Sequence, residues 1–92
     1  MDKKELIYQS LKDLTIDSEP ERYFGPNKIF FHGIGRISEG IWDKSLEEKD
    51  LPKRSDAKNY LEELVGEGRA KVIIATIGDL AVTDVRVYRA RL

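Results

Sequence analysis

Residues 52–92 of this chain read PKRSDAKNYLEELVGEGRAKVIIATIGDLAVTDVRVYRARL. The first third of the stretch predicts a helix over about residues 53–66, because its apolar residues recur at the i, i+3, i+4, i+7 and i+8 spacing of a core-facing helical stripe. The stripe consists of Ala57, Tyr60, Leu61, Leu64 and Val65. Gly66 or Gly68 is expected to end the helix. This helix is therefore predicted to pack on the core.

The remainder of the stretch predicts a β-hairpin. Residues 71–77 are dense in β-branched side chains, which favour strands. Gly78-Asp79 is a two-residue turn signal, and residues 80–92 supply a returning strand. The chain is therefore expected to close with two antiparallel strands.

Another helix is predicted near the start of the sequence, over about residues 3–14. Asp2 offers an N-cap acceptor and Glu5 follows three residues later, which approximates a capping box. The apolar residues that follow share one side of the helix: Leu6, Ile7, Leu11 and Leu14. This side is expected to face the core.

The middle of the chain is predicted to hold a turn-rich loop, a short strand and a second helix. Residues 15–27 are rich in turn formers, and Tyr23 and Phe24 are expected to pin this loop to the core. Residues 28–32, KIFFH, form a β-prone run. Ser38 is a suitable cap for the second helix. The inner residues of that helix would be Ile41, Trp42, Ser45 and Leu46.

Composition limits the class of protein. The 92 residues make one domain, residues 1–92, because a chain of this length cannot hold two cores. Charged residues make up 36% of the chain, against roughly 25% in an average soluble domain, a bias that recurs in hyperthermophile proteins. Cysteine is absent, which excludes disulfides, Cys-ligated metals and thiol nucleophiles. With no signal peptide and no apolar run of about 20 residues, a cytoplasmic protein without a membrane span is expected.

Charge is distributed unevenly along the chain, although the net charge is only −1. Residues 1–51 carry eight basic and eleven acidic side chains, and residues 52–92 carry eight basic and six acidic ones. The C-terminal half is therefore the part suited to a polyanion. A nucleic-acid-binding domain usually has a stronger basic excess.

The predicted order of elements is helix, strand, helix, helix, strand, strand, which is an α+β fold. This order resembles the winged helix-turn-helix domain. The residues that carry the resemblance are Leu61-x-x-Leu64, Gly68, Val72-Ile73-Ile74 and Tyr88. The long segment between the first two helices and Gly40 inside the second depart from the family pattern. The resemblance implies a winged-helix-like fold of three helices, a short strand and a C-terminal β-hairpin.

The resemblance also implies that the third helix binds double-stranded DNA, because the corresponding helix of the family enters the major groove. The polar face opposite the apolar stripe would then contact DNA through Arg54, Ser55, Lys58 and Asn59. Arg54 can reach guanine and Asn59 can reach adenine, while Ser55 and Lys58 suit phosphates. The alternative is an ordinary solvated face with weak i,i+4 contacts, which Glu62, Glu63 and Glu67 favour.

The basic residues that flank the hairpin would hold the DNA backbone: Arg69, Lys71 and Arg86. The alternative is that these charges protect strand edges from pairing with other chains. The tip, residues 78–82, carries no cation and suits a protein partner better than a phosphate.

No catalytic or metal-binding set is predicted. His32 is the single histidine and sits in an apolar context, which is typical of a core or rim histidine. Gly33-x-Gly35 is a weak phosphate-loop signal and is better explained as a hinge. One histidine and no cysteine leave too few groups for a nucleophile and its base. A non-enzyme without a cofactor is therefore expected.

Three functions are compatible with these patterns. The first is a DNA-binding protein that acts as a transcriptional regulator or a chromosome-associated factor. The second is a winged-helix module that binds protein and not DNA, and the third is an enzyme-associated or metal-binding α+β protein. A homodimer is also expected, with the first helix in the interface, because its apolar residues and Tyr8 exceed what one small core uses.

Overall fold

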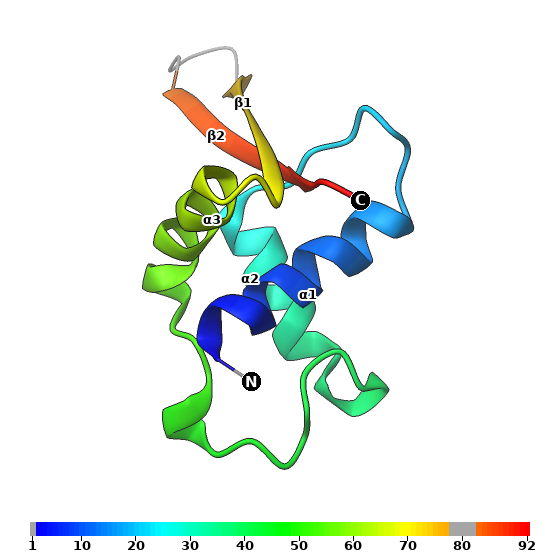
Figure 1. The fold of residues 1–92 in the computed structure, drawn as a ribbon, viewed down its shortest axis with the longest axis vertical. Coiled ribbons are helices and arrows are strands. Elements are labelled where there is room, and N and C mark those ends of the chain that lie inside the picture. Colours follow the sequence, from blue (N-terminus) through cyan, green and yellow to red (C-terminus); the bar gives the residue numbers. More distant parts are fainter. Residues whose placement is uncertain (1, 78–82) are drawn as a thin grey trace.

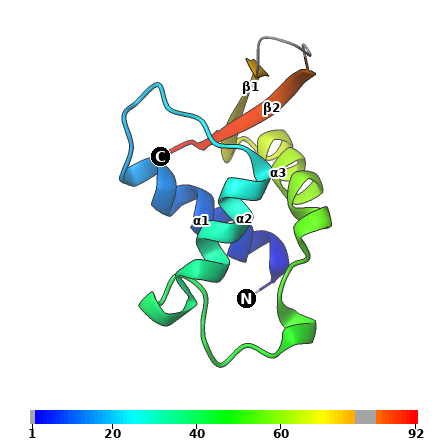
Figure 2. The ribbon, with the colours of Figure 1, turned by 180° about the vertical axis from the view of Figure 1, so that it is seen from behind.

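The computed structural model describes residues 2–77 and 83–92, and it is an α+β domain of three helices and a two-stranded antiparallel sheet (Figure 1). The helices are α1 (Lys3–Ile16), α2 (Pro26–Gly35) and α3 (Ala57–Gly66), and the strands are β1 (Ala70–Ile77) and β2 (Thr83–Ala90). The hairpin projects from one end of the three-helix body, as both views show (Figures 1 and 2). The predicted turn at Gly78-Asp79 and the tip at 78–82 lie outside the described residues.

The first helix forms where its cap and its apolar spacing predict it. The Asp2 side chain accepts a hydrogen bond from the Glu5 N–H at 2.8 Å, which satisfies one free donor of the first turn. Leu6, Ile7 and Leu11 are buried in the core of the same chain. The prediction of a dimer through this helix depends on apolar surface that one core does not use. Most of that surface is buried within a single copy of the chain.

The strand predicted over residues 28–32 is wrong, because this run lies inside α2. Pro26 occupies the first turn of α2, where its fixed φ favours a helix start. Ile29, Phe30 and Gly33 then lie on the buried side of the helix. Packing of this side outweighs the β preference of a short aromatic run.

The second helix predicted from Ser38 is also wrong. Residues 36–56 follow an irregular path with three short 3₁₀ turns, Ile37–Glu39, Glu48–Asp50 and Arg54–Asp56. Gly40 has a φ of 89°, a left-handed conformation that ends the first of these turns and is incompatible with a continuing helix. The third turn precedes α3, which therefore begins at Ala57 and not near residue 53.

The hairpin pairs β1 with β2 in a continuous register from Ala70 opposite Ala90 to Ile77 opposite Thr83. A third segment joins the outer edge of β2: Phe24 donates to the Tyr88 carbonyl at 2.8 Å and accepts from the Tyr88 N–H at 2.7 Å. In the segment that connects α1 to α2, only Phe24 pairs with a strand among the described residues, and Phe24 lies before the predicted strand at residues 28–32.

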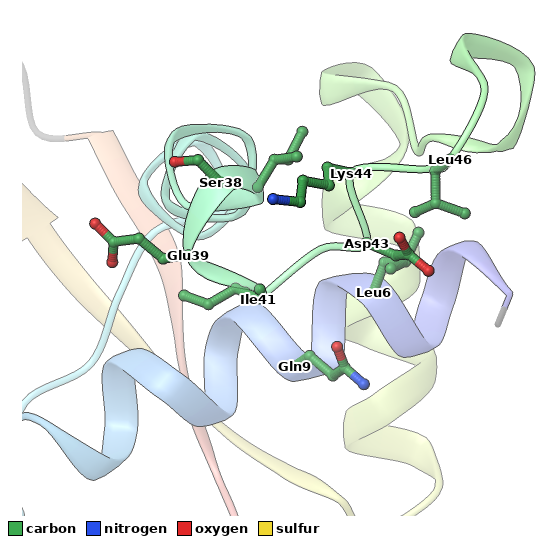
Figure 3. Close-up of a pocket in the computed structure, with 10 residues that line it drawn as sticks. Leu6, Gln9, Ser38, Glu39, Ile41, Asp43, Lys44 and Leu46 are labelled. Carbon is green, nitrogen blue, oxygen red and sulfur yellow. The ribbon is translucent and has the colours of Figure 1, made fainter.

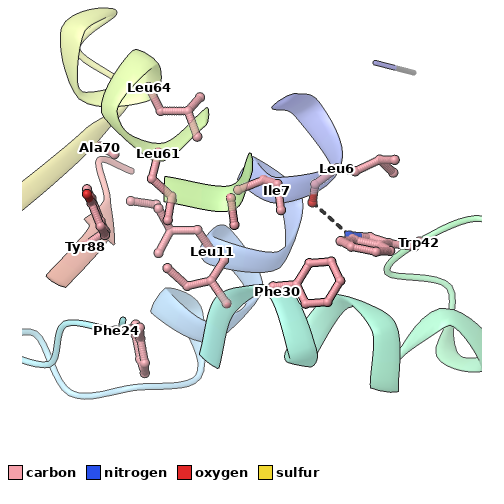
Figure 4. Packing of buried hydrophobic residues seen from close by; sticks show 13 residues of the cluster. Leu6, Ile7, Leu11, Phe24, Phe30, Trp42, Leu61, Leu64, Ala70 and Tyr88 are labelled. Atoms are coloured by element: carbon pink, nitrogen blue, oxygen red, sulfur yellow. Dashed lines mark hydrogen bonds between the residues drawn. The ribbon is translucent and has the colours of Figure 1, made fainter. Parts of the chain in front are cut away.

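The core lies between the three helices and the base of the hairpin (Figure 4). Ala57, Leu61 and Leu64 of α3 are buried as the stripe predicts, while Tyr60 and Val65 are half-buried. Trp42 is buried although its predicted helix is absent, and its indole N–H donates to the Leu6 carbonyl at 2.9 Å. This bond satisfies the polar atom of the ring and holds the irregular segment against α1.

None of the helices in the described residues has both the length and the apolar character that crossing a membrane requires.

Candidate functional site: a basic groove beside β2

A groove of about 480 Å³ lies where the start of α2, the turn before α3 and the strand β2 come together. Its lining brings together segments that are far apart in the sequence: Gly25, Pro26, Asn27, Lys28, Arg54, Ser55, Lys58, Val85, Arg86 and Val87. Four of these residues are cations. The groove is therefore a concave surface with positive charge on several sides.

Three of the cations lack a carboxylate partner among the described residues. Lys28, Arg54 and Lys58 are exposed and form no ion pair there. Lys28 stands in the first turn of α2, and Arg54 and Lys58 stand one helical turn apart around the start of α3. Their side chains are therefore available to an anionic ligand.

The fourth cation, Arg86, already has a partner. Its guanidinium donates to the Glu62 carboxylate from both Nε and Nη2, the second bond at 2.9 Å, and the Tyr88 hydroxyl donates to the same carboxylate at 2.6 Å. Bidentate pairing of this kind is among the stronger charge-assisted contacts. The Arg86 bond holds the pKa of Glu62 below its ordinary range, and burial raises the pKa of Tyr88 to about 12.

The remaining predicted DNA-binding residues lie outside the groove lining. Asn59 is exposed on α3, next to Lys58. Arg69 donates to Glu5 from both terminal nitrogens, one bond at 2.9 Å, and its guanidinium lies 4.1 Å from the centre of the Tyr8 ring. Arg69 therefore connects α1 to the base of the hairpin. Lys71 is exposed on β1, opposite Arg89 in the register.

Arg89 fixes the loop that follows α1. Its Nη1 donates to Ser18 Oγ at 2.9 Å and to the carbonyls of Glu19 and Arg22 at 2.7 and 2.9 Å. The Arg89 guanidinium is therefore already hydrogen-bonded within the fold.

The sequence pattern missed one residue of the groove, Lys28, and one residue that contacts a groove cation, Glu62. Lys28 lies in the first turn of α2 and not in the predicted strand, and the Gly25-Pro26 pair that starts α2 is the signal that could have placed it there. In the sequence pattern Glu62 favours a solvated face, whereas in the structure it is the partner of Arg86. That partnership joins α3 to β2, and local spacing does not reveal it.

A second hollow, of about 630 Å³, lies between α1 and the irregular segment 37–46 (Figure 3). Leu6, Ile37 and Ile41 form part of its wall. Its acidic side chains have local partners: Asp43 accepts from the Ser45 N–H at 2.8 Å, and Glu39 pairs with Arg36. The charged residues that line this hollow, Glu39, Asp43 and Lys44, are of mixed sign, whereas those that line the groove are all cations.

His32 lies between α1 and α2, where its Nε2 contacts the Asp13 carboxylate. It is half-buried at the rim of the core. Within residues 2–77 and 83–92, no three His, Cys, Asp or Glu side chains are grouped so as to hold a metal ion.

No protein-family model, no curated protein and no solved structure matches this chain.

Proposed function

We propose that this chain is a small winged-helix-type protein that binds double-stranded DNA, as a transcriptional regulator or a chromosome-associated factor. The observation that carries the proposal is the groove itself: Arg54 and Ser55 of the turn before α3 and Lys58 of the first turn of α3 lie in one hollow with Lys28 at the start of α2. Cations on separate elements that surround one concave surface suit a phosphate backbone.

The arrangement of elements supports a winged-helix type. Two helices precede a third, and an antiparallel hairpin follows the third helix. Phe24, which lies between the first two helices in the sequence, pairs with the outer edge of that hairpin. The irregular segment 36–56 between α2 and α3 is longer than the short turn usual in a helix-turn-helix unit.

The proposal assigns the DNA contacts to Lys28, Arg54, Ser55 and Lys58, with the exposed Asn59 beside them. Arg69 is left out, because Glu5 and Tyr8 already hold its guanidinium. Arg86 contributes only when Glu62 releases it. The three groove cations that form no ion pair within the described residues predict a shallow salt dependence, with a slope of log K against log salt of about −2.7 per protomer.

The test is a titration of a labelled DNA duplex at about 50 mM salt and at several higher concentrations, where counterion release weakens binding. Arg54→Ala and Lys58→Ala are each expected to reduce the slope by about one contact. The matched control is Lys12→Ala, an exposed lysine of α1 outside the groove. Absence of DNA binding at about 50 mM salt, or equal losses in all three variants, would contradict the proposal.

A second candidate is a module that binds an acidic segment of another protein and no DNA. The observation that favours it is the mixed chemistry of the groove, where Pro26, Val85 and Val87 lie among the cations and Glu62 neutralises Arg86. Apolar surface beside charge is typical of the contact region of a protein interface. The same titration separates the two functions, because this candidate predicts no salt-dependent binding of duplex DNA.

A further inference from the structure

The outer edge of β2 is paired at one residue and open at the next equivalent one. Phe24 and Tyr88 exchange two main-chain hydrogen bonds, of 2.8 and 2.7 Å, as directly opposed residues of an antiparallel pair do. The N–H and C=O of Tyr88 therefore point away from β1. Because these groups alternate between the two edges along a strand, and the register with β1 is continuous, the N–H and C=O of Arg86 point to the same outer edge.

The segment that pairs with Tyr88 turns away before it reaches Arg86. If the chain continued as a strand after Phe24, position 26 would lie opposite Arg86, but Pro26 has no N–H to donate and starts α2 instead. Within the described part of the chain, neither the N–H nor the C=O of Arg86 has a hydrogen-bond partner on this edge. The basic groove lies at this place, since Gly25, Pro26 and Arg86 all line it. Its wall therefore offers one main-chain donor and one main-chain acceptor.

This pair of groups matches a peptide better than a nucleic acid. The phosphates of a DNA backbone offer oxygens, which accept from an N–H but cannot donate to a C=O. An extended peptide offers both groups, and addition of a strand to a free sheet edge is a recurrent way in which proteins bind a segment of a partner. Such a segment would run antiparallel to β2, as Phe24 does, and exchange both hydrogen bonds with Arg86.

The charged wall of the groove favours an acidic side chain in the segment. The Arg86 side chain reaches Glu62 on α3, so this face of β2 is turned toward α3. A ligand residue opposite Arg86 has its side chain on the same face, toward the start of α3. Arg54 and Lys58 line the groove there and form no ion pair among the described residues. A carboxylate therefore suits the position opposite Arg86.

The next residue of the segment meets an apolar wall. It lies opposite Val85 and has its side chain on the other face of β2, the face that Val85 shares with Val87. Both valines line the groove, and so does Pro26. An apolar side chain therefore fits at this second position. Asp84 follows toward the hairpin tip, so one acidic residue, and not an acidic run, is expected in the segment.

We infer that the groove binds an extended segment of another protein, which adds as an antiparallel strand to the outer edge of β2 and carries an acidic residue followed by an apolar one. The segment binds whether or not the chain also binds DNA. Its carboxylate would meet the same cations that are proposed to hold phosphates. If both ligands bind, the segment and a DNA duplex therefore exclude one another.

Hydrogen exchange, followed by NMR, tests the edge and its occupant without any DNA. The probe is a synthetic, end-capped peptide, Thr-Glu-Val-Thr-Val. In the free chain the Arg86 amide is expected to exchange faster than the amides of Val85 and Val87, which point at β1. A peptide concentration about ten times the dissociation constant should slow exchange at Arg86 about tenfold. An Arg86 amide that is already protected in the free chain, or that is not slowed by the peptide, would overturn the inference.

Variants of the peptide separate strand addition from charge attraction alone. Methylation of the glutamate nitrogen removes the donor to the Arg86 C=O without changing any charge, and it should weaken binding about tenfold. Glutamine in place of the glutamate removes the carboxylate and should weaken binding about threefold. Equal affinity of the methylated and unmethylated peptides, or of the glutamate and glutamine peptides, would contradict the assigned pose.

Variants of the protein locate the carboxylate. Lys58→Ala is expected to weaken the glutamate peptide about threefold and the glutamine peptide hardly at all. Lys12→Ala, an exposed lysine outside the groove, is the matched control and should change neither affinity. Equal effects of the two variants would overturn the inference. A duplex that binds to a chain on which the peptide has no effect, even at millimolar concentration, would assign the groove to DNA alone.

Discussion

At the scale of single residues, Gly33 lies directly against the ring of Trp42. A Cβ atom at position 33 would overlap the buried indole ring, whereas a Cβ at Gly35, at the end of the same helix, would meet nothing within 4 Å. The indole cannot retreat without losing its hydrogen bond to the Leu6 carbonyl. The absence of a side chain at Gly33 is therefore what lets α2 approach the tryptophan.

Gly33→Ala is expected to lower the free energy of unfolding by about 1–3 kcal/mol, the usual cost of overpacking a core. Gly35→Ala is the matched control and is expected to be neutral or slightly stabilising, because alanine favours a helix over glycine. Urea unfolding of both variants measures the difference. Equal stability of the two would show that Trp42 does not pack against Gly33 as described.

Two carboxylates are stabilised in their ionised form by arginine. The hydrogen bond from Arg69 holds the pKa of Glu5 below its ordinary value of 4.5, and the bond from Arg86 does the same for Glu62. A folded-state pKa below the unfolded one contributes stability above the unfolded pKa, and this contribution is lost as pH falls through the folded pKa. Acid is therefore expected to break the contact that joins α1 to the base of the hairpin and the contact that joins α3 to β2.

The double variant Glu5→Gln/Glu62→Gln is expected to lose less stability than the wild type between pH 7 and pH 3. Unfolding in urea at both values gives the comparison. Glu21→Gln/Glu48→Gln, which changes two exposed glutamates, serves as the control and should keep the wild-type pH dependence. A double variant at positions 5 and 62 that loses as much stability as the wild type would contradict this account.

At the scale of elements, α3 is the helix whose burial follows most directly from its spacing. Leu61 is fully buried in its centre, and Val65, one turn later, is half-buried. Leu61→Ala is expected to cost about 2–5 kcal/mol of stability, and Val65→Ala distinctly less. Thermal or urea unfolding measures both. A loss below about half a kcal/mol for Leu61→Ala would mean that α3 is not packed through this stripe.

The sequence predicts elements well where a periodic stripe is long and poorly where packing decides. The apolar stripes of α1 and α3 recur over several turns and identify each segment as a helix. The run Ile29-Phe30-Phe31 is too short for its period to separate strand from helix, and burial of Ile29 and Phe30 in the core selects the helix. Trp42 is predicted as a core residue for its type, although hydrogen bonding to α1 and not a helix of its own holds it there.

The candidate site is predictable only in part, for a related reason. Arg54, Ser55 and Lys58 follow from the polar face of one helix, and they do line the groove. The partners of Arg69 and Arg86 lie 64 and 24 residues away in the sequence, on other elements. Which arginines remain free for a ligand is therefore a property of the tertiary structure, and no local pattern contains it.

At the scale of the whole molecule, the net charge of −1 is a poor guide to where an anion would bind. Screening limits exposed charges to a range of about 10 Å at 0.1 M salt, so a ligand in the groove responds mainly to nearby side chains. Glu62 is the carboxylate that neutralises a groove cation, whereas the neighbouring Glu63 is exposed and lies 3.9 Å from Lys4, on the side of α1. Removing either charge changes the net charge equally.

Glu62→Gln is therefore expected to raise the affinity for duplex DNA and to steepen the salt dependence by about one contact, because it frees Arg86 for a phosphate. Glu63→Gln makes the same change in net charge without releasing an arginine, and it should leave the slope unchanged. In the Arg86→Gln background the two variants should become equal. Titrations over a range of salt concentrations measure all three effects. Equal affinities and slopes for Glu62→Gln and Glu63→Gln in the wild-type background would show that Arg86 takes no part in binding, while the contacts of Arg54 and Lys58 would still stand.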